Sequence, residues 1–213
     1  MSEKPIVFVV DDDEAARDSL GWLVRSVGLE VVTSASAAEF LKRFDPGQPG
    51  CLILDIRMPG MSGLELLNRL QELHAVLPVI IITGHGDVPM AVRALKAGAM
   101  EFIEKPFNDQ ELLDCVHRGI QKDVERRITI QQRQRVIERY EQLTPREREV
   151  MSGVVEGLPN KVIGRKLDIS VKTVEAHRAR IMEKMQASSL SQLVRMALTL
   201  ESHASESSHA THA

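Results

Sequence analysis

The chain has 213 residues, of which 43% are hydrophobic and 27% are charged, and these values are close to globular averages. The composition excludes a fully disordered chain, a collagen-like fibre and a disulfide-stabilised miniprotein. Aromatic residues make up only 3% of the chain, so it has too few rings to build a stacking surface for single-stranded nucleic acid. The length exceeds the about 100 to 150 residues of a typical domain and favours two domains.

The sequence predicts a cytoplasmic protein without a membrane partner. Its first apolar run, residues 6–10, is shorter than the roughly 7 to 15 apolar residues of a secretion signal. No apolar run approaches the ~20 residues that cross a bilayer. Cys51 and Cys115 are the only cysteines and form no C-x-x-C pair, which suits a reducing compartment. We expect both thiols to lie in the core.

The net charge of −3 combines segments of opposite sign. Residues 1–121 carry 11 Lys and Arg against 18 Asp and Glu, residues 122–143 carry 6 against 4, and residues 144–213 carry 10 against 8. An acidic first part and a mildly basic remainder predict different partners for each part. The basic excess is too small to indicate nucleic-acid binding by itself.

Up to residue 121, short apolar runs alternate with helical patterns. Buried strands are predicted at residues 6–10, 31–33, 52–55, 79–83 and 101–104. Between them, apolar residues recur at the three- and four-residue spacing of amphipathic helices, over residues 14–27, 37–44, 63–73, 89–96 and 109–121. This alternation predicts an α/β fold with a doubly wound five-stranded parallel sheet. Any site would lie at the carboxyl ends of its strands.

The rest of the chain contains no strand pattern. Residues 122–138 lack Gly and Pro and are rich in Gln, Arg and Glu, which predicts a helical linker. A flexible charged tether is the alternative, because the apolar periodicity stops at residues 131–135. Residues 139–204 predict a small all-α domain, with an N-cap, a first-turn proline and a capping-box glutamate in Thr144-Pro145-Arg146-Glu147. Residues 205–213, mostly Ser, His and Ala, predict a disordered tail.

Polar side chains follow four of the predicted strands. Asp11 and Asp12 come after the first strand, Asp55 ends the third, Thr83 ends the fourth and Lys105 follows the fifth. Because strand ends converge in a doubly wound sheet, these side chains are expected to meet. Neighbouring carboxylates raise each other's pKa unless a cation shares their site. A hard divalent ion that prefers oxygen ligands, Mg²⁺ above all, would relieve this repulsion.

A carboxylate beside Mg²⁺ is also a nucleophile that can accept a phosphoryl group. Asp55 is the candidate phosphoacceptor, with the Lys105 ammonium and the Thr83 hydroxyl as its catalytic partners. Taken singly, Asp13 would be an ordinary helix N-cap and Lys105 a solvated side chain. Chance is a poor explanation for suitable polar residues at the ends of four strands. We therefore favour the hypothesis that these residues form one phosphoacceptor site.

The first part of the chain resembles the receiver domain of two-component response regulators. The resemblance covers residues 4–121 and is carried by V-V-D-D-D, L-D-I-R-M-P-G-M-S-G, I-T-G-H-G-D-V-P-M-A-V and F-I-E-K-P-F. It implies a flavodoxin-like fold in which a sensor histidine kinase phosphorylates Asp55. It also implies that Mg²⁺ is held by Asp11, Asp12, Asp55 and the backbone carbonyl of Arg57.

The same resemblance implies a conformational switch. Lys105 would contact the phosphoryl oxygens, before a Lys–Pro bond that is commonly cis. Thr83 and Phe102 would change position together on phosphorylation. A homodimer would then form through a surface that includes Val92, Lys96 and Phe102. The alternative for Val92 and Lys96 is an ordinary amphipathic helix that covers the sheet.

Residues 160–185 contain two short helical patterns joined by a tight turn at residues 168–170, whose last residue is a candidate N-cap. Val174, Ile181 and Met185 share one face of the second pattern. This arrangement predicts a helix-turn-helix, whose second helix enters the major groove of DNA. A helical hairpin for protein contact would explain the periodicity but not the cationic outer face.

Residues 139–204 resemble the LuxR-type DNA-binding domain through L-T-P-R-E-R-E-V-M, G-L-P-N-K-V-I and T-V-E-A-H-R-A-R-I-M-E-K-M. With the receiver-like part in front, the whole chain resembles a FixJ-type transcriptional regulator. Gly164 stands where such domains usually have Ala, which predicts a helix looser by up to about 1 kcal/mol. The resemblance implies contacts with double-stranded DNA from Lys161, Lys172, Thr173, Glu175, Ala176, His177, Arg178 and Arg180. A structural role beside the turn is an equal alternative for His177.

The main hypothesis is a phosphorylation-activated transcription factor. A kinase acts on Asp55, the receiver dimerises, paired sites on DNA are bound and RNA polymerase is recruited. The alternative is an aspartyl-phosphate hydrolase for a small phosphorylated substrate. Such enzymes commonly carry a second aspartate two positions after the nucleophile, where this chain has Arg57, so we do not predict an enzyme. An adaptor that never touches DNA is disfavoured by Lys161, Lys172 and the two arginines at 178 and 180.

Overall fold

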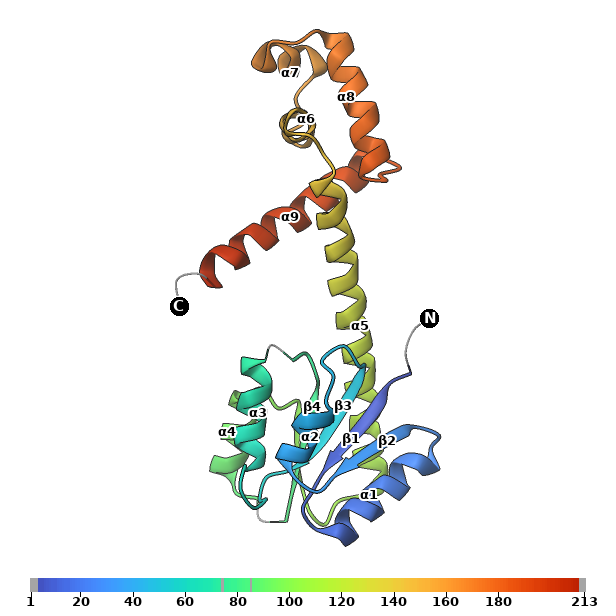
Figure 1. The fold of residues 1–213 in the computed structure, drawn as a ribbon, viewed down its shortest axis with the longest axis vertical. Coiled ribbons are helices and arrows are strands. Elements are labelled where there is room, and N and C mark those ends of the chain that lie inside the picture. The colour runs from blue at the N-terminus through green and yellow to red at the C-terminus, as the bar shows by residue number, and fades with distance from the viewer. Residues whose placement is uncertain (1–3, 74, 85, 211–213) are drawn as a thin grey trace. The chain divides into compact units, whose positions relative to one another are not determined.

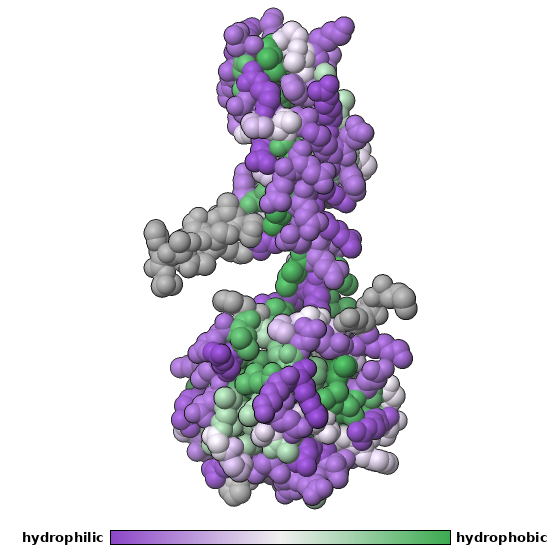
Figure 2. All heavy atoms as spheres, viewed as in Figure 1, coloured by the Kyte–Doolittle hydropathy of each residue, from purple (hydrophilic) through white to green (hydrophobic). Residues whose placement is uncertain are grey.

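The computed structural model describes residues 4–73, 75–84 and 86–210, and for residues 202–210 only the helical backbone. It divides into two compact units between Arg127 and Ile128, and Figure 1 shows the fold of the chain. Within these ranges, no helix is both long and apolar enough to span a membrane. Figure 2 shows that the viewed face of both units is largely hydrophilic, with apolar residues gathered on the first unit.

The first unit is built on a parallel five-stranded sheet with the order β2-β1-β3-β4-β5. Its strands are β1 (Ile6–Val10), β2 (Glu30–Ser34), β3 (Gly50–Asp55), β4 (Val79–Thr83) and β5 (Glu101–Glu104). The predicted doubly wound sheet is confirmed. β2 and β3 begin earlier than predicted because Ile6 of β1 pairs with both Glu30 and Gly50, so the ladder extends beyond the apolar runs.

Helices cover both faces of this sheet. They are α1 (Glu14–Ser26), α2 (Ala37–Arg43), α3 (Gly63–Glu72), α4 (Val88–Lys96) and α5 (Asp109–Glu141). α2, α3 and α4 pack on one face through residues such as Phe40 and Leu66, and α1 and α5 pack on the other through Val24 and Leu112. All residues of β3 and β4 are buried, as is typical of central parallel strands. Cys51 and Cys115 are buried thiols.

α5 extends through the segment for which the sequence predicted a helical linker. Its residues up to Arg127 belong to the first unit, and those from Ile128 belong to the second. From residue 120 to its end, α5 contains neither Gly nor Pro, so no residue with poor helix propensity interrupts it.

The second unit is all-α, as predicted. Besides the end of α5 it contains α6 (Pro145–Val155), α7 (Asn160–Leu167), α8 (Val171–Lys184) and α9 (Leu190–Ala210). The predicted N-cap Thr144 and its capping-box partner Glu147 start α6, and Ser170 caps α8. Asp168 begins the turn between α7 and α8 with a φ of 53°. The core contains Val150, Ile163, Val174, Ile181 and Met185.

The disordered tail predicted from residue 205 differs from the structure, in which α9 continues to Ala210. Residues 190–210 contain neither Gly nor Pro, and alanine is the strongest helix former. The polar composition of this stretch therefore did not end the helix. Residues 211–213 of the predicted tail lie outside the described residues.

Candidate functional site

The carboxyl ends of four strands bring Asp11, Asp55, Thr83 and Lys105 together, and we call these residues the acidic pocket. Lys105 Nζ lies 2.8 Å from Asp11 Oδ2 and 3.5 Å from Asp55 Oδ1. Asp11, Asp55 and Thr83 are buried, whereas Lys105 is half-buried. β1 and β3 flank the point at which the strand order reverses, which is where sites form in open α/β sheets.

Backbone groups fix the two carboxylates of the acidic pocket. Asp55 Oδ2 accepts a hydrogen bond from the Arg57 amide at 2.7 Å, and Asp11 Oδ1 accepts one from the Asp13 amide at 2.9 Å. The resemblance to receiver domains implied a role for the backbone carbonyl of Arg57, and the contact of its amide was not predicted. The Lys105–Pro106 peptide bond is cis.

The electrostatic balance of the pocket leaves Asp55 short of positive charge. Burial raises the pKa of Asp55; Lys105 lowers it, Asp11 raises it, and the net effect is a rise. Burial alone would lower the pKa of Lys105, but the carboxylates of Asp11 and Asp55 outweigh burial and raise it. One ammonium therefore serves two buried carboxylates, and a further cation would relieve their repulsion.

The predicted third carboxylate does not join this pair. Asp12 is exposed and lies in the bend that connects β1 to α1. In the described part of the chain, no three acidic, histidine or cysteine side chains converge closely enough to hold a metal ion. The pair Asp11 and Asp55 still fits Mg²⁺, since this ion takes one or two carboxylates and keeps several waters.

Arg17 on α1 contacts the pocket loop and was missed by the sequence reasoning. Its Nη1 donates to the carbonyl of Asp11 at 2.8 Å and to that of Asp12 at 3.3 Å. The Asp13 side chain caps α1, and the amides of Ala16 and Ala15 lower its pKa. Arg17 lies one turn after this cap, and that spacing is the signal that could have revealed it.

The predicted switch residues lie on neighbouring strands. Thr83 is the buried last residue of β4, and Phe102 pairs with Ile81 of that strand. The Phe102 ring is half-buried and packs against the core on the α2–α4 face. Val92 and Lys96, the predicted dimer residues, are exposed on α4. Val88 and Leu95 of α4 are also exposed and were not predicted.

α8 of the second unit presents a polar outer face. Its Val174 and Ile181 are buried against α6 and α7. Exposed predicted DNA-contact residues of this unit are Lys161, Lys172, Glu175, Ala176 and Arg180.

Three other predicted DNA-contact residues, Thr173, His177 and Arg178, are half-buried. Arg178 Nη1 donates to Asn160 Oδ1 at 2.9 Å and so joins α8 to the start of α7. Thr173 Oγ1 lies 2.8 Å from Ser170 Oγ. His177 Nδ1 is buried without a hydrogen-bond partner among the described residues, so both the DNA contact and the structural role stay predictions for this side chain.

Two family profiles match the chain. The response regulator receiver domain matches residues 7–117, and the bacterial regulatory proteins of the luxR family match residues 141–197. These matches coincide with the acidic pocket and with the helix-turn-helix, respectively.

Relatives match both parts together. Nodulation protein W of Bradyrhizobium diazoefficiens is 48% identical over 199 residues, which cover 93% of this chain and 88% of that protein. Transcriptional regulatory protein FixJ of Rhizobium meliloti is 48% identical over 192 residues, which cover 90% and 94%. The structure of the response regulator StyR is 46% identical, covers 91% of this chain and 98% of that one, and gives a TM-score of 0.85. The chain therefore belongs to the FixJ-like two-component response regulators, transcription factors that join a receiver domain to a LuxR-type DNA-binding domain.

Proposed function

We propose that phosphorylation of Asp55 by a sensor histidine kinase switches this transcription factor to its DNA-binding form. The observation that carries the proposal is the convergence of Asp11, Asp55 and Lys105 at the strand ends, with Nζ–O distances of 2.8 and 3.5 Å. A buried carboxylate beside an ammonium and a second acid is the arrangement that phosphoryl transfer to an aspartate requires.

The chemistry follows from the contacts of each oxygen. Asp55 Oδ2 is occupied by the Arg57 amide, so Oδ1, which faces Lys105, attacks the phosphorus of the phosphohistidine. An O–P bond forms, the P–N bond breaks, and its electron pair leaves with the imidazole. Lys105 then neutralises charge on the transferred phosphoryl oxygens. Asp11, Asp12, Asp55 and the Arg57 carbonyl would hold Mg²⁺, and the ion would supply further positive charge at these oxygens.

The output follows from the two surfaces described above. Thr83 and Phe102 respond to the phosphoryl group, and the α4 surface with Val92 and Lys96 forms a homodimer. Exposed side chains of α7 and α8 contact double-stranded DNA, and the bound protein recruits RNA polymerase to that DNA. We place these events in the cytoplasm, where DNA is accessible. The hydrolase alternative is not favoured, because the second unit is a DNA-binding domain and Arg57 occupies the position of the second aspartate.

The test replaces Asp55 by Asn in the full chain. We expect Asp55→Asn to abolish labelling by a small phosphodonor such as acetyl phosphate, and with it the gain in DNA affinity that phosphorylation causes. Asp18→Asn, at an exposed acid of α1, is the matched control and should retain both. Labelling that persists in Asp55→Asn would refute the assignment of the phosphoacceptor.

A further inference from the structure

Two residues of α5 fasten this helix to the end of the sheet opposite the acidic pocket. Asp123 is 0% exposed, and its Oδ2 accepts hydrogen bonds from the Gly50 amide at 2.8 Å and from Arg127 Nε at 2.7 Å. The guanidinium of Arg127 also donates to the backbone carbonyls of residues 46, 47 and 48 at 3.1, 2.7 and 2.8 Å. We call Asp123, Arg127 and the loop 46–50 the α5 clamp.

The clamp depends strongly on Arg127. A buried carboxylate is costly unless it is paired and hydrogen-bonded. Among the described residues, Asp123 Oδ1 has no hydrogen-bond partner, so the burial of this charge depends on the two donors to Oδ2. The negative charge of Asp123 also acts on the neighbouring strand residue Cys51: burial, together with this charge, raises the pKa of the Cys51 thiol to about 12. Removal of Arg127 would leave an uncompensated charge in the interior.

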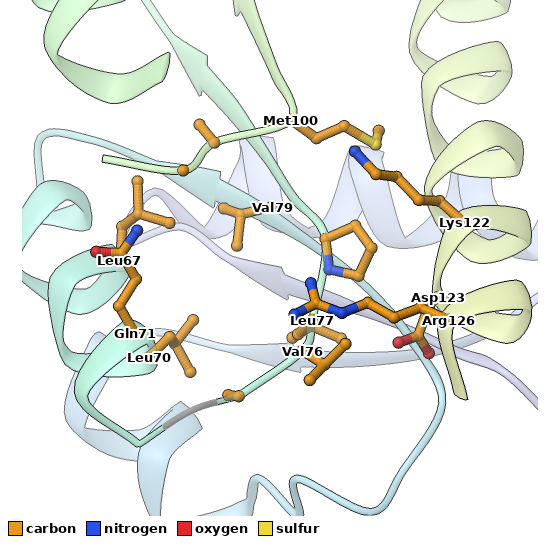
Figure 3. Close-up of a pocket in the computed structure, with 14 residues that line it drawn as sticks. Leu67, Leu70, Gln71, Val76, Leu77, Val79, Met100, Lys122, Asp123 and Arg126 are labelled. Atoms are coloured by element: carbon orange, nitrogen blue, oxygen red, sulfur yellow. The ribbon is translucent and has the colours of Figure 1, made fainter. Parts of the chain in front are cut away.

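Apolar packing alone does not hold this stretch of α5. Ile120 still packs against the core, but the next turn borders a cavity of about 420 Å³. Figure 3 shows Lys122, Asp123 and Arg126 on one side of this cavity, with Leu70 of α3 on the other. The hydrogen bonds of the clamp therefore replace the side-chain packing that secures α5 earlier in its course.

The two α5 residues of the clamp lie beyond the end of the family-defined receiver. The receiver profile ends at residue 117, whereas the first compact unit ends at Arg127, the residue that closes the clamp. The clamp also contacts the strand that carries the phosphoacceptor. Gly50 is the first residue of β3, Asp55 is the last, and all residues between them are buried.

We propose that the α5 clamp ends the rigid receiver at Arg127, and that Asp123 and Arg127 are positioning residues that fix the exit of the linker helix to β3. The receiver then passes its change of state to residues after Arg127. The structural half of this proposal stands without the proposed function, and the signalling half rests on it.

The structural half is tested by amide hydrogen exchange on the full chain. Arg127→Met and Arg126→Met each remove one positive charge from neighbouring positions, but Arg126 is exposed and makes none of the clamp contacts. We expect Arg127→Met to speed exchange by about tenfold or more in two segments distant in sequence, residues 45–50 and 120–127, since local opening controls such exchange. Arg126→Met should leave both segments as in the wild type.

A second variant keeps the test decisive if Arg127→Met disturbs folding. Arg127→Lys retains the charge but loses the planar fork that reaches several carbonyls, so its exchange should be intermediate. Retained labelling of Asp55 shows that the acidic pocket is folded in each variant. Equal exchange rates in the variants at 127 and at 126 would overturn the clamp.

The signalling half is tested by DNA affinity with and without phosphodonor. Arg127→Met should keep the label on Asp55 but lose most of the phosphorylation-dependent gain in affinity, whereas Arg126→Met should keep both. A full gain in Arg127→Met despite faster exchange would overturn the positioning role. If the wild type itself shows no gain, the proposed function fails, and hydrogen exchange still decides whether the clamp exists.

Discussion

The position of Phe102 depends on the absence of a side chain at residue 86. Gly86 lies between β4 and α4, and a Cβ there would approach Phe102 Cε1 to 3.1 Å and Cζ to 3.2 Å. Carbon atoms pack best at about 3.5 to 4.0 Å, so an alanine at this position requires the ring to shift by a few tenths of an ångström. The loop after Thr83 and the proposed switch ring are thus in direct steric contact.

We expect Gly86→Ala to displace the Phe102 ring whether or not the chain is phosphorylated. The phosphorylation-dependent gain in DNA affinity should shrink, and stability should fall by about 0.5 to 1.5 kcal/mol if the ring leaves its preferred rotamer. Gly84→Ala is the control, because a Cβ at residue 84 meets nothing within 4 Å. Affinity titrations of the two variants that show the same gain would contradict the steric coupling.

At the scale of elements, a partly buried ion pair joins the start of α6 to the end of α8. Glu147 Oε2 accepts hydrogen bonds from Lys184 Nζ at 2.7 Å and from the Thr144 amide at 2.9 Å. Burial alone would raise the pKa of Glu147, but its bonds to Lys184 and Thr144 outweigh burial and lower it. A lowered pKa stabilises the fold at neutral pH, and this contribution is lost as the pH falls through the folded-state pKa.

Glu147→Gln should therefore destabilise the second unit at neutral pH by about 1 to 3 kcal/mol and reduce its loss of stability in acid. The control is Glu149→Gln, which breaks an exposed pair with Arg146 and should cost at most about 1 kcal/mol. Tyr140, the only tyrosine of the chain, packs against the core of this unit and reports its unfolding by near-ultraviolet circular dichroism. Parallel pH–stability curves for wild type and Glu147→Gln would count against the role of the ion pair.

Local signals explain which elements could be predicted from the sequence. The five strands and the start of α6 rest on apolar runs and on the cap Thr144, which act within a few residues. The polar composition of residues 205–213 suggested a disordered tail, whereas α9 runs to Ala210 in the structure over a stretch without a helix breaker. The acidic pocket was predicted because parallel strands align their ends at one edge of the sheet. The exposure of Asp12 was not predicted, because it depends on the direction of a single side chain.

Long-range contacts explain most of what was missed. Arg127 bonds to carbonyls 79 to 81 residues away, and no local pattern announces such a contact. The bond from Arg178 to Asn160 spans 18 residues and gives that arginine a structural partner. A cationic helix face in the sequence therefore predicts which surface contacts DNA, but it does not predict which of its residues make the contacts.

At the scale of the whole molecule, the different surroundings of Arg178 and Arg180 predict distinct effects on DNA binding when each is replaced. Arg180 is exposed, so Arg180→Met should weaken binding across all sequences and reduce the magnitude of the negative slope of log K against log salt by about one. Arg178→Met should weaken binding mainly by loosening α7 from α8, with a smaller change in slope. Titrations at several salt concentrations measure both slopes, and equal slope changes would show that Arg178 also neutralises a phosphate.

The burial of β3 on every side also restricts how the protein can diversify. A strand held between two neighbours and two helical layers has no room to move, so strain created at its tip has to be released in peripheral loops and outer strands. Variation that retunes the strength or duration of the response is therefore expected to accumulate on α4 and on the outer strand β5. New regulators can arise there by small substitutions while the chemistry at the centre stays unchanged.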